Sequence, residues 1–159
     1  MDKIWLKSYP AGIPESINID DFNSIIDLFE QSCKKFADKP AYNSMGVCLT
    51  YQELDRLSQN FASYLQNELN LTKGDRLAIM MPNLLQYPIT LFGAMRAGIT
   101  IVNVNPLYTP RELEHQLTDS GAKAIVILEN FAHVLDQCIA KTPIEHVITT
   151  EIGDCFGFL

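Results

Sequence analysis

The 159 residues are 47% hydrophobic and 19% charged, which is the balance of a globular protein long enough to bury a core. The formal net charge of −7 argues against a nucleic-acid-binding protein, because phosphate contacts need clustered lysine and arginine. The first residues contain no apolar stretch long enough for a signal peptide. The most apolar region, residues 89–104, is interrupted by Arg96, whereas a bilayer span needs about 20 apolar residues. We therefore expect a soluble, cytoplasmic protein.

The four cysteines, Cys33, Cys48, Cys138 and Cys155, are widely spaced and form no CxxC pair. Cys33 and Cys138 fall on the apolar stripes of expected helices. This spacing is typical of reduced thiols in the core of a cytoplasmic protein, rather than of a disulfide framework or a zinc site.

The first third of the chain predicts one helix and a hairpin. Residues 1–21 are punctuated by proline and glycine and are expected to be irregular. From Asn23 onward, apolar residues recur at helical spacing as far as Phe36. Residues 41–45 and 47–50 then favour a β-hairpin that turns near glycine.

The next helix begins at a capping box, in which Thr50 and Glu53 satisfy free amides at the helix start. Strand 76–80 follows, then a helix over 84–97 that stops at glycine, with Pro88 as an alternative mark of its first turn. Strand 100–104 completes this unit.

A second cap combines Thr109, Pro110 and Glu112 and predicts a helix that ends at residues 120–121. The remaining expected elements are strand 124–128, helix 131–140 and strand 146–150. The first of these strands is nearly all apolar, as in a strand buried on both faces.

Strands that alternate with helices through short loops indicate parallel βαβ units. We predict an α/β fold: a Rossmann-like layered βαβ subdomain with a mostly parallel sheet, plus an N-terminal helix and β-hairpin. The expected organisation is an irregular segment at 1–21, the α/β subdomain at 22–150, and a truncated connection to a further domain at 151–159.

Ligands of α/β proteins usually bind beyond the carboxyl ends of the strands. Asn83, Asn105, Tyr108 and Asn130 follow expected strands there and could hydrogen-bond a ligand. The same residue types are also favoured in turns and caps for backbone reasons, so a structural role is the alternative.

Motifs for a nucleotide or a metal are missing from the sequence. None of the glycines falls in GxGxxG or before a Lys-Ser or Lys-Thr pair, and residues 81–84 read Met-Pro-Asn-Leu where a dinucleotide loop would be expected. His115, His133 and His146 never occur as i, i+4 pairs. We therefore predict no catalytic, cofactor-binding or metal-binding residue in this chain.

Five short stretches, taken in this order and spacing, resemble the N-terminal part of adenylate-forming (AMP-binding) enzymes. They are residues 49–54 (LTYQEL), 73–76 (KGDR), 81–83 (MPN), 96–98 (RAG) and 119–123 (DSGAK). This superfamily includes acyl-CoA synthetases, luciferases and the adenylation domains of peptide synthetases.

Within that superfamily, residues 83–88 (NLLQYP) and 102–117 (VNVNPLYTPRELEHQL) resemble bacterial long-chain fatty acid–CoA ligases. Plant-type aryl-CoA ligases share the Asn-Pro-x-Tyr-Thr-Pro pattern, so another acyl- or aryl-CoA ligase is the alternative.

The resemblance implies a reaction that joins a long-chain fatty acid to CoA through an acyl-adenylate formed from ATP, with Mg²⁺ present. The family's phosphate loop, later motifs and lid lysine match nothing here and would follow residue 159. We expect the chain alone to be catalytically incomplete and to bind none of these cofactors.

Two other interpretations stay open. The chain could act as a dimerisation or structural module, since ligases of this type can self-associate through N-terminal regions, with Trp5, Phe156 and Phe158 as contacts. A small nucleotide-binding protein is favoured only by the βαβ pattern. Peripheral contact with the inner membrane would have to involve residues 1–20 or a missing part.

Overall fold

The computed structural model describes residues 2–156. Its main sheet contains β3 (Arg76–Met80), β4 (Thr100–Asn103), β5 (Ala124–Leu128) and β6 (His146–Thr150). Every neighbouring pair is parallel, in the order β4-β3-β5-β6. The chain therefore runs from β3 to one side and then crosses back to the other. The predicted α/β fold with a mostly parallel sheet is confirmed.

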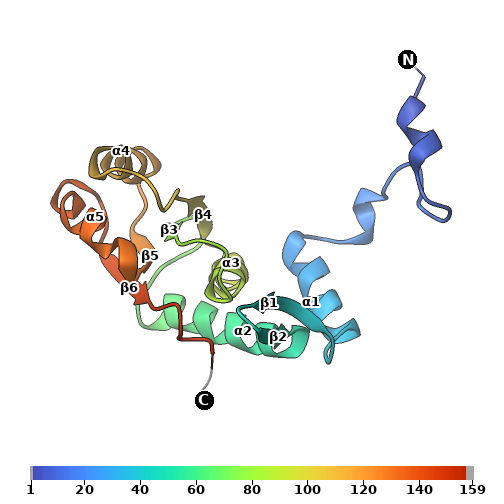
Figure 1. Ribbon diagram of the computed structural model, residues 1–159, viewed down its shortest axis with the longest axis horizontal. Helices are drawn as coiled ribbons and strands as arrows, with labels where there is room; N and C mark the ends of the chain where they lie inside the picture. Colours follow the sequence, from blue (N-terminus) through green and yellow to red (C-terminus); the bar gives the residue numbers. More distant parts are fainter. Residues whose placement is uncertain (1, 157–159) are drawn as a thin grey trace.

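Helices cover both faces of this sheet (Figure 1). α2 (Tyr51–Asn67) and α3 (Gln86–Arg96) lie on one face, and α4 (Pro110–Ser120) and α5 (Ala132–Asp136) lie on the other. Because strand side chains alternate between faces, β3 contributes to two cores. Its Leu77 and Ile79 pack with α2 and α3 in the first core, and its Ala78 and Met80 pack with α4 and α5 in the second.

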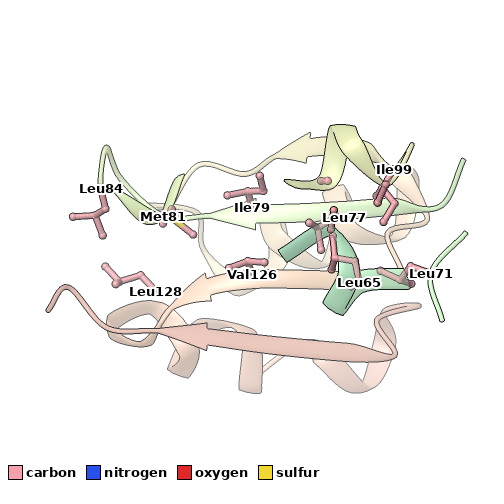
Figure 2. Close-up of a cluster of buried hydrophobic side chains, with 13 residues drawn as sticks. Leu65, Leu71, Leu77, Ile79, Met81, Leu84, Ile99, Val126 and Leu128 are labelled. Atoms are coloured by element: carbon pink, nitrogen blue, oxygen red, sulfur yellow. The ribbon is translucent and has the colours of Figure 1, made fainter. Parts of the chain in front are cut away.

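Figure 2 shows a close-up of the buried side chains of the first core. Leu65 of α2 lies against Leu77 of β3, and Val126 and Leu128 of β5 continue the apolar layer towards the carboxyl ends of the strands. All five residues of β5 are buried, which explains the uninterrupted apolar run of its sequence.

A third core joins the first part of the chain to this body. α1 (Ile25–Lys35) and the hairpin of β1 (Pro40–Ser44) and β2 (Val47–Thr50) pack around Phe29, Leu54 and other apolar residues. The predicted helix and hairpin are thus present.

The Arg96 guanidinium reinforces this junction. It donates to Glu30 Oε1 at 2.6 Å and to Ser58 Oγ at 3.1 Å, and it forms an ion pair with Asp55. Arg96 therefore links α3 to both α1 and α2.

Both predicted capping boxes form. Thr50 Oγ1 accepts the Glu53 amide at 3.2 Å, and Glu53 Oε2 accepts the Thr50 amide at 2.9 Å. The equivalent distances for Thr109 and Glu112 are 3.4 and 2.8 Å, and α4 begins at the proline that follows Thr109. Local cap chemistry sets these two helix starts.

α1 begins at Ile25, two residues later than predicted, and two further helices also have the wrong limits. α3 begins at Gln86 instead of residue 84, because the Leu84 amide bonds to the Pro82 carbonyl at 2.9 Å in a turn. The expected helix over 131–140 is only the five residues of α5, flanked by 3-10 turns at Glu129–Phe131 and Ile139–Lys141. Neither helix has a side-chain cap to define its start. β4 also ends one residue earlier than predicted.

Residues 2–21 form an extended arm that projects from the rest of the molecule (Figure 1). The arm contains 3-10 turns at Ile4–Ser8 and Ile19–Asp21. Its apolar side chains are exposed, including Trp5, which is 51% exposed. The other exposed large apolar residues of the arm are Ile4, Tyr9, Ile13, Ile17 and Ile19. Among the residues described, no helix is long and apolar enough to cross a bilayer.

The four cysteines are free. Cys33 and Cys138 are buried as predicted, and burial raises the pKa of the Cys33 thiol to about 11. The interpretation as a core thiol is wrong for Cys48, which is exposed because the alternation of β2 turns Leu49 inward instead. Cys155 is half-buried beside the third core.

Candidate functional site

The strand order reverses between β3 and β5, and ligands of such sheets bind beyond the carboxyl ends of the strands at this point. The loop at 81–85 and the turn at 129–131 border it here. Met81, Leu84 and Leu128 lie at this end of the first core (Figure 2) and are all buried. The floor of the candidate site is therefore apolar.

Polar side chains gather around Asn103 on one flank of this floor. The Tyr87 hydroxyl donates to Asn103 Oδ1 at 2.9 Å, and Gln116 Nε2 donates to the Asn103 carbonyl at 2.9 Å. The other amide atom of Gln116, Oε1, is buried and has no partner within residues 2–156. Tyr87 and Gln116 were not predicted as site residues.

Gln86 lies in the first turn of α3 and joins it to the segment after β6. Its Nε2 donates to the Glu151 carbonyl at 2.6 Å, while its Oε1 is buried without a partner in the described part of the chain. Asp154 Oδ2 holds the same segment by accepting from Thr150 Oγ1 and from the Glu151 amide, both at 2.8 Å. A buried acceptor without a partner costs about 1–3 kcal/mol, so the two glutamine amides mark this edge as incompletely bonded.

A cavity of about 310 Å³ opens between β1 and the loop that follows β3. Asn83 lines it, together with Tyr42, Tyr87 and the backbone around Leu84. Partial burial raises the pKa of the Tyr42 hydroxyl above its usual value. The volume is at the lower end of the range for small-molecule sites.

The other candidate residues have backbone roles. Asn105 Oδ1 accepts the Leu107 amide at 3.0 Å, and the Tyr108 amide bonds to the Asn105 carbonyl at 3.1 Å, so both residues build a turn. The Tyr108 ring packs against the second core. Asn130 is exposed, and its carbonyl lies 3.1 Å from His133 Nδ1. Of the four predicted positions, only Asn83 lines the cavity.

This edge does not fit a triphosphate or a magnesium ion. The loop at 81–85 contains no glycine, lysine, serine or threonine, and Leu85, the N-cap residue of α3, provides no side-chain cap. No group of three or more His, Cys, Asp and Glu side chains that could hold a metal occurs in the part of the chain described. His115 is exposed on α4, and His146 begins β6.

The opposite, amino-terminal edge of the sheet is densely bonded. Arg76 donates to the Gly121 carbonyl through Nε at 3.1 Å and Nη2 at 2.9 Å. Lys123 Nζ lies 2.8 Å from Asp75 Oδ1, and this hydrogen bond is the main reason that the pKa of Asp75 falls to about 2. The Gly74 amide bonds to the Gly98 carbonyl at 3.0 Å.

Three of the five stretches that carry the resemblance, at 73–76, 96–98 and 119–123, therefore meet at this amino-terminal edge. Gly121 caps α4 in the left-handed region with φ 61°, and a Cβ there would lie 2.9 Å from Arg76 Nη2. The positive φ is what favours glycine at this position, because the end of the flexible Arg76 side chain could move away from a Cβ. These stretches build the scaffold.

Curated proteins with similar sequences include several ligases. The chain is 58% identical over 154 residues to the long-chain-fatty-acid–CoA ligase of Escherichia coli O6:H1, covering 97% of this chain and 28% of that protein. The same enzyme of Yersinia pestis is 58% identical, with 97% and 27% covered. The chain thus spans little more than a quarter of the length of these relatives.

Solved structures give the same result. A long-chain-fatty-acid-CoA ligase from Archaeoglobus fulgidus superposes with a TM-score of 0.77 at 26% identity, over 89% of this chain and 30% of that one. An anthranilate CoA ligase bound to anthranoyl-AMP has the same TM-score of 0.77 at 18% identity, over 81% of this chain and 25% of that one, and shares the fold.

A family model described as AMP-binding enzyme matches residues 29–156, which include the second half of α1, the hairpin and the entire parallel sheet. The stretches at 49–54, 73–76, 81–83, 96–98 and 119–123 all lie within this range. The resemblance noted in the sequence is thereby confirmed, and the chain belongs to the AMP-binding enzyme family.

Proposed function

We propose that this chain is the N-terminal part of an ATP-dependent long-chain fatty acid–CoA ligase. The observation that carries the proposal is the 58% identity to such ligases over 97% of this chain and only 28% of their length. Residues 22–150 would form the α/β subdomain, residues 1–21 an N-terminal arm, and residues 151–159 the connection to the rest of the enzyme.

The reaction joins a fatty carboxylate to CoA in two steps. A carboxylate is a poor electrophile because its negative charge repels nucleophiles. Transfer of AMP from ATP makes an acyl-adenylate and releases diphosphate, and the CoA thiolate then displaces AMP. Long-chain fatty acid, ATP and CoA are the proposed substrates, with Mg²⁺ as the ion that accompanies ATP.

The proposed contribution of this chain is structural. Its carboxyl edge presents an apolar floor, the Asn83 cavity and two incompletely bonded glutamines, Gln86 and Gln116, to whatever packs there. Nucleotide-binding and catalytic groups would come from the remaining part of the enzyme. We propose no catalytic, cofactor-binding or metal-binding residue within residues 1–159.

A chimera tests this function. The matched segment of the Escherichia coli relative is replaced by this chain, and palmitate-dependent acyl-CoA formation and ATP–diphosphate exchange are measured. We expect an active chimera and no exchange by the 159-residue chain alone. A folded but inactive chimera would contradict the fatty acid ligase assignment, and robust exchange by the chain alone would contradict its catalytic dependence on the missing part.

Self-association is a second candidate function, favoured by the exposed apolar arm. Trp5 is 51% exposed, whereas Phe156 is half-buried and Phe158 lies outside the described residues. Light scattering over a concentration series tests it, and a strict monomer would count against it. The proposed location is the cytoplasm, with contact at the inner membrane assigned to the arm.

A further inference from the structure

The surface of α1 that faces away from the body is unusually apolar. Ile25 is 62% exposed and Leu28 is 43% exposed, and Phe22 before the helix and Tyr42 of the hairpin are 40% and 42% exposed. In most surface helices the apolar stripe faces the core. Here α1 has a second apolar stripe beyond the one that packs in the third core.

Two hollows lie along this stripe and share Leu28 and Ser32. One, of about 650 Å³, runs from Phe22 towards Phe36 at the end of α1. The other, of about 250 Å³, enters between α1, the hairpin and the α2–α3 pair. The residues that line the second hollow are mostly apolar: Ile25, Leu28, Phe29, Ser32, Ala41, Tyr42, Tyr51, Leu54 and Phe92. We call the two hollows together the α1 groove.

One end of the α1 groove is positively charged. Lys34 and Lys35 line it, and the ammonium groups of Lys35 and Lys39 lie 5.2 and 5.3 Å from the centroid of the Phe36 ring. None of the three lysines forms an ion pair within residues 2–156. In a chain of net charge −7, three neighbouring unpaired lysines stand out.

Lysines in the last turn of a helix also stabilise its C-terminal dipole, and this accounts for Lys34 and Lys35 by itself. It does not account for the apolar hollow that Lys34 and Lys35 border, or for Lys39, which lies beyond the helix and reaches the hollow only through the ring of Phe36. A groove with an apolar length and a cationic end is complementary to a ligand with one negative head and a long apolar tail.

We propose that the α1 groove binds a long-chain carboxylate, with the head at Lys34 and Lys35, the charge of Lys39 close by, and the tail over Leu28. The choice of ligand rests on the proposed function, since such a carboxylate is the substrate of the parent enzyme. The groove is lined by α1, the hairpin and their neighbours, and none of the loops beyond the parallel strands lines it. It would hold fatty acid close to the enzyme before the reaction.

Equilibrium dialysis of radiolabelled palmitate, below its micellar concentration, against the 159-residue chain tests this site. We expect saturable binding that weakens at least tenfold in the triple variant Lys34→Gln, Lys35→Gln, Lys39→Gln. A matched triple variant at exposed lysines elsewhere, Lys7→Gln, Lys73→Gln, Lys141→Gln, should bind within twofold of the unmodified chain. Hexadecanol, which has the same tail and no charge, should bind at least tenfold more weakly.

Leu28→Asp tests the apolar part of the α1 groove. Because Leu28 is partly exposed, the variant should keep its circular dichroism spectrum, but it should lose its saturable binding of palmitate. Absence of saturable binding, or equal losses in the two triple variants, overturns the proposal. Binding to phosphatidylglycerol vesicles without binding of free palmitate also overturns it, in favour of a membrane surface.

The two proposals can fail separately. An active chimera whose N-terminal chain binds no palmitate overturns the groove alone. An inactive chimera whose chain still binds palmitate through the lysines overturns the ligase assignment alone.

Discussion

The amino-terminal edge of the parallel sheet and its carboxyl edge are built from the same four strands but are bonded very differently. At the amino-terminal edge, Arg76 spans to Gly121 and Lys123 pairs with Asp75. At the carboxyl edge, Gln86 and Gln116 each leave a buried amide oxygen without a partner among the described residues. Within residues 2–156, the first edge is densely bonded and the second is incompletely bonded.

This difference suggests a structural role for several of the sequence stretches that carry the family resemblance. Residues 73–76 and 119–123 meet at the densely bonded edge, where glycines and ion pairs fix the strand ends. These stretches therefore reflect folding requirements, whereas residues 81–83 follow β3 at the carboxyl edge, where ligands of α/β proteins bind. Four predictions test this comparison, from the largest expected effect to the smallest.

Gly121→Val should have the largest effect, lowering the free energy of unfolding by about 3 kcal/mol. A β-branched residue at φ 61° is strained, and its Cβ would lie 2.9 Å from Arg76 Nη2. Urea unfolding followed by circular dichroism measures the change. Gly153→Val is the control, since a Cβ at Gly153 meets no atom within 4 Å, and it should cost less than about 0.5 kcal/mol. Equal costs would mean that the amino-terminal edge is not specially constrained.

Arg76→Met should cost about 2 kcal/mol, because it removes two charge-assisted hydrogen bonds from the Gly121 carbonyl while keeping an apolar stem. The same unfolding assay applies. Arg111→Met, at an exposed position on α4, should change stability by less than about 0.5 kcal/mol. A cost below 0.5 kcal/mol for Arg76→Met would show that these bonds are dispensable.

Asp75 should make this edge sensitive to acid. Its pKa is lowered from 3.8 to about 2, mainly by the bond from Lys123, so the folded state binds its proton less readily than the unfolded state. The resulting stability is present above pH 4 and is lost as the pH falls towards 2. With allowance for solvent screening it amounts to about 1 kcal/mol.

Urea unfolding at pH 6 and pH 3 tests this in the unmodified chain and in Asp75→Asn. The variant should show a smaller loss on acidification. Some loss should remain, because hydrogen bonds from Thr50 and Thr109 also lower the pKa values of Glu53 and Glu112. Identical pH dependence in the two proteins would contradict the role of the Asp75–Lys123 pair.

Gln86→Leu should have the smallest effect, within about 0.5 kcal/mol of the unmodified chain, although it removes a hydrogen bond of 2.6 Å. It also removes the buried Oε1 that has no partner, and because Glu151 is exposed its carbonyl can bond to water after the change. Leu65→Ala, at a fully buried residue of the first core, should cost about 3 kcal/mol and shows the range of the assay. A cost of 2 kcal/mol for Gln86→Leu would mean that the carboxyl edge is as firmly bonded as the other.

The features that could be predicted from the sequence are those determined by neighbours in the chain. The cap formed by Thr109, Pro110 and Glu112 predicts the start of α4 correctly, and the apolar run of β5 predicts a strand buried on both faces. α3 begins later than predicted because its first turn has no capping side chain, so only the turn at Pro82 sets its limit.

The candidate site was less predictable because its contacts join distant residues. Gln86 of α3 bonds to Glu151, which is 65 positions away in the sequence. Gln116 of α4 bonds to Asn103 at the end of β4. An asparagine that follows a strand can indicate a ligand site. The same pattern also occurs in residues that form turns, so it identifies Asn105 as readily as the cavity residue Asn83. A glutamine inside an apolar helix was the more informative pattern, because glutamine is seldom fully buried.

The projecting arm has a practical consequence for spectroscopy. Trp5 is the only tryptophan of the chain, and it lies in the arm, apart from the sheet. Its emission will therefore report on the arm, while circular dichroism reports on the α/β body. Unfolding curves from the two probes should have different midpoints even if the body unfolds in one step, so their disagreement would be no sign of a folding intermediate.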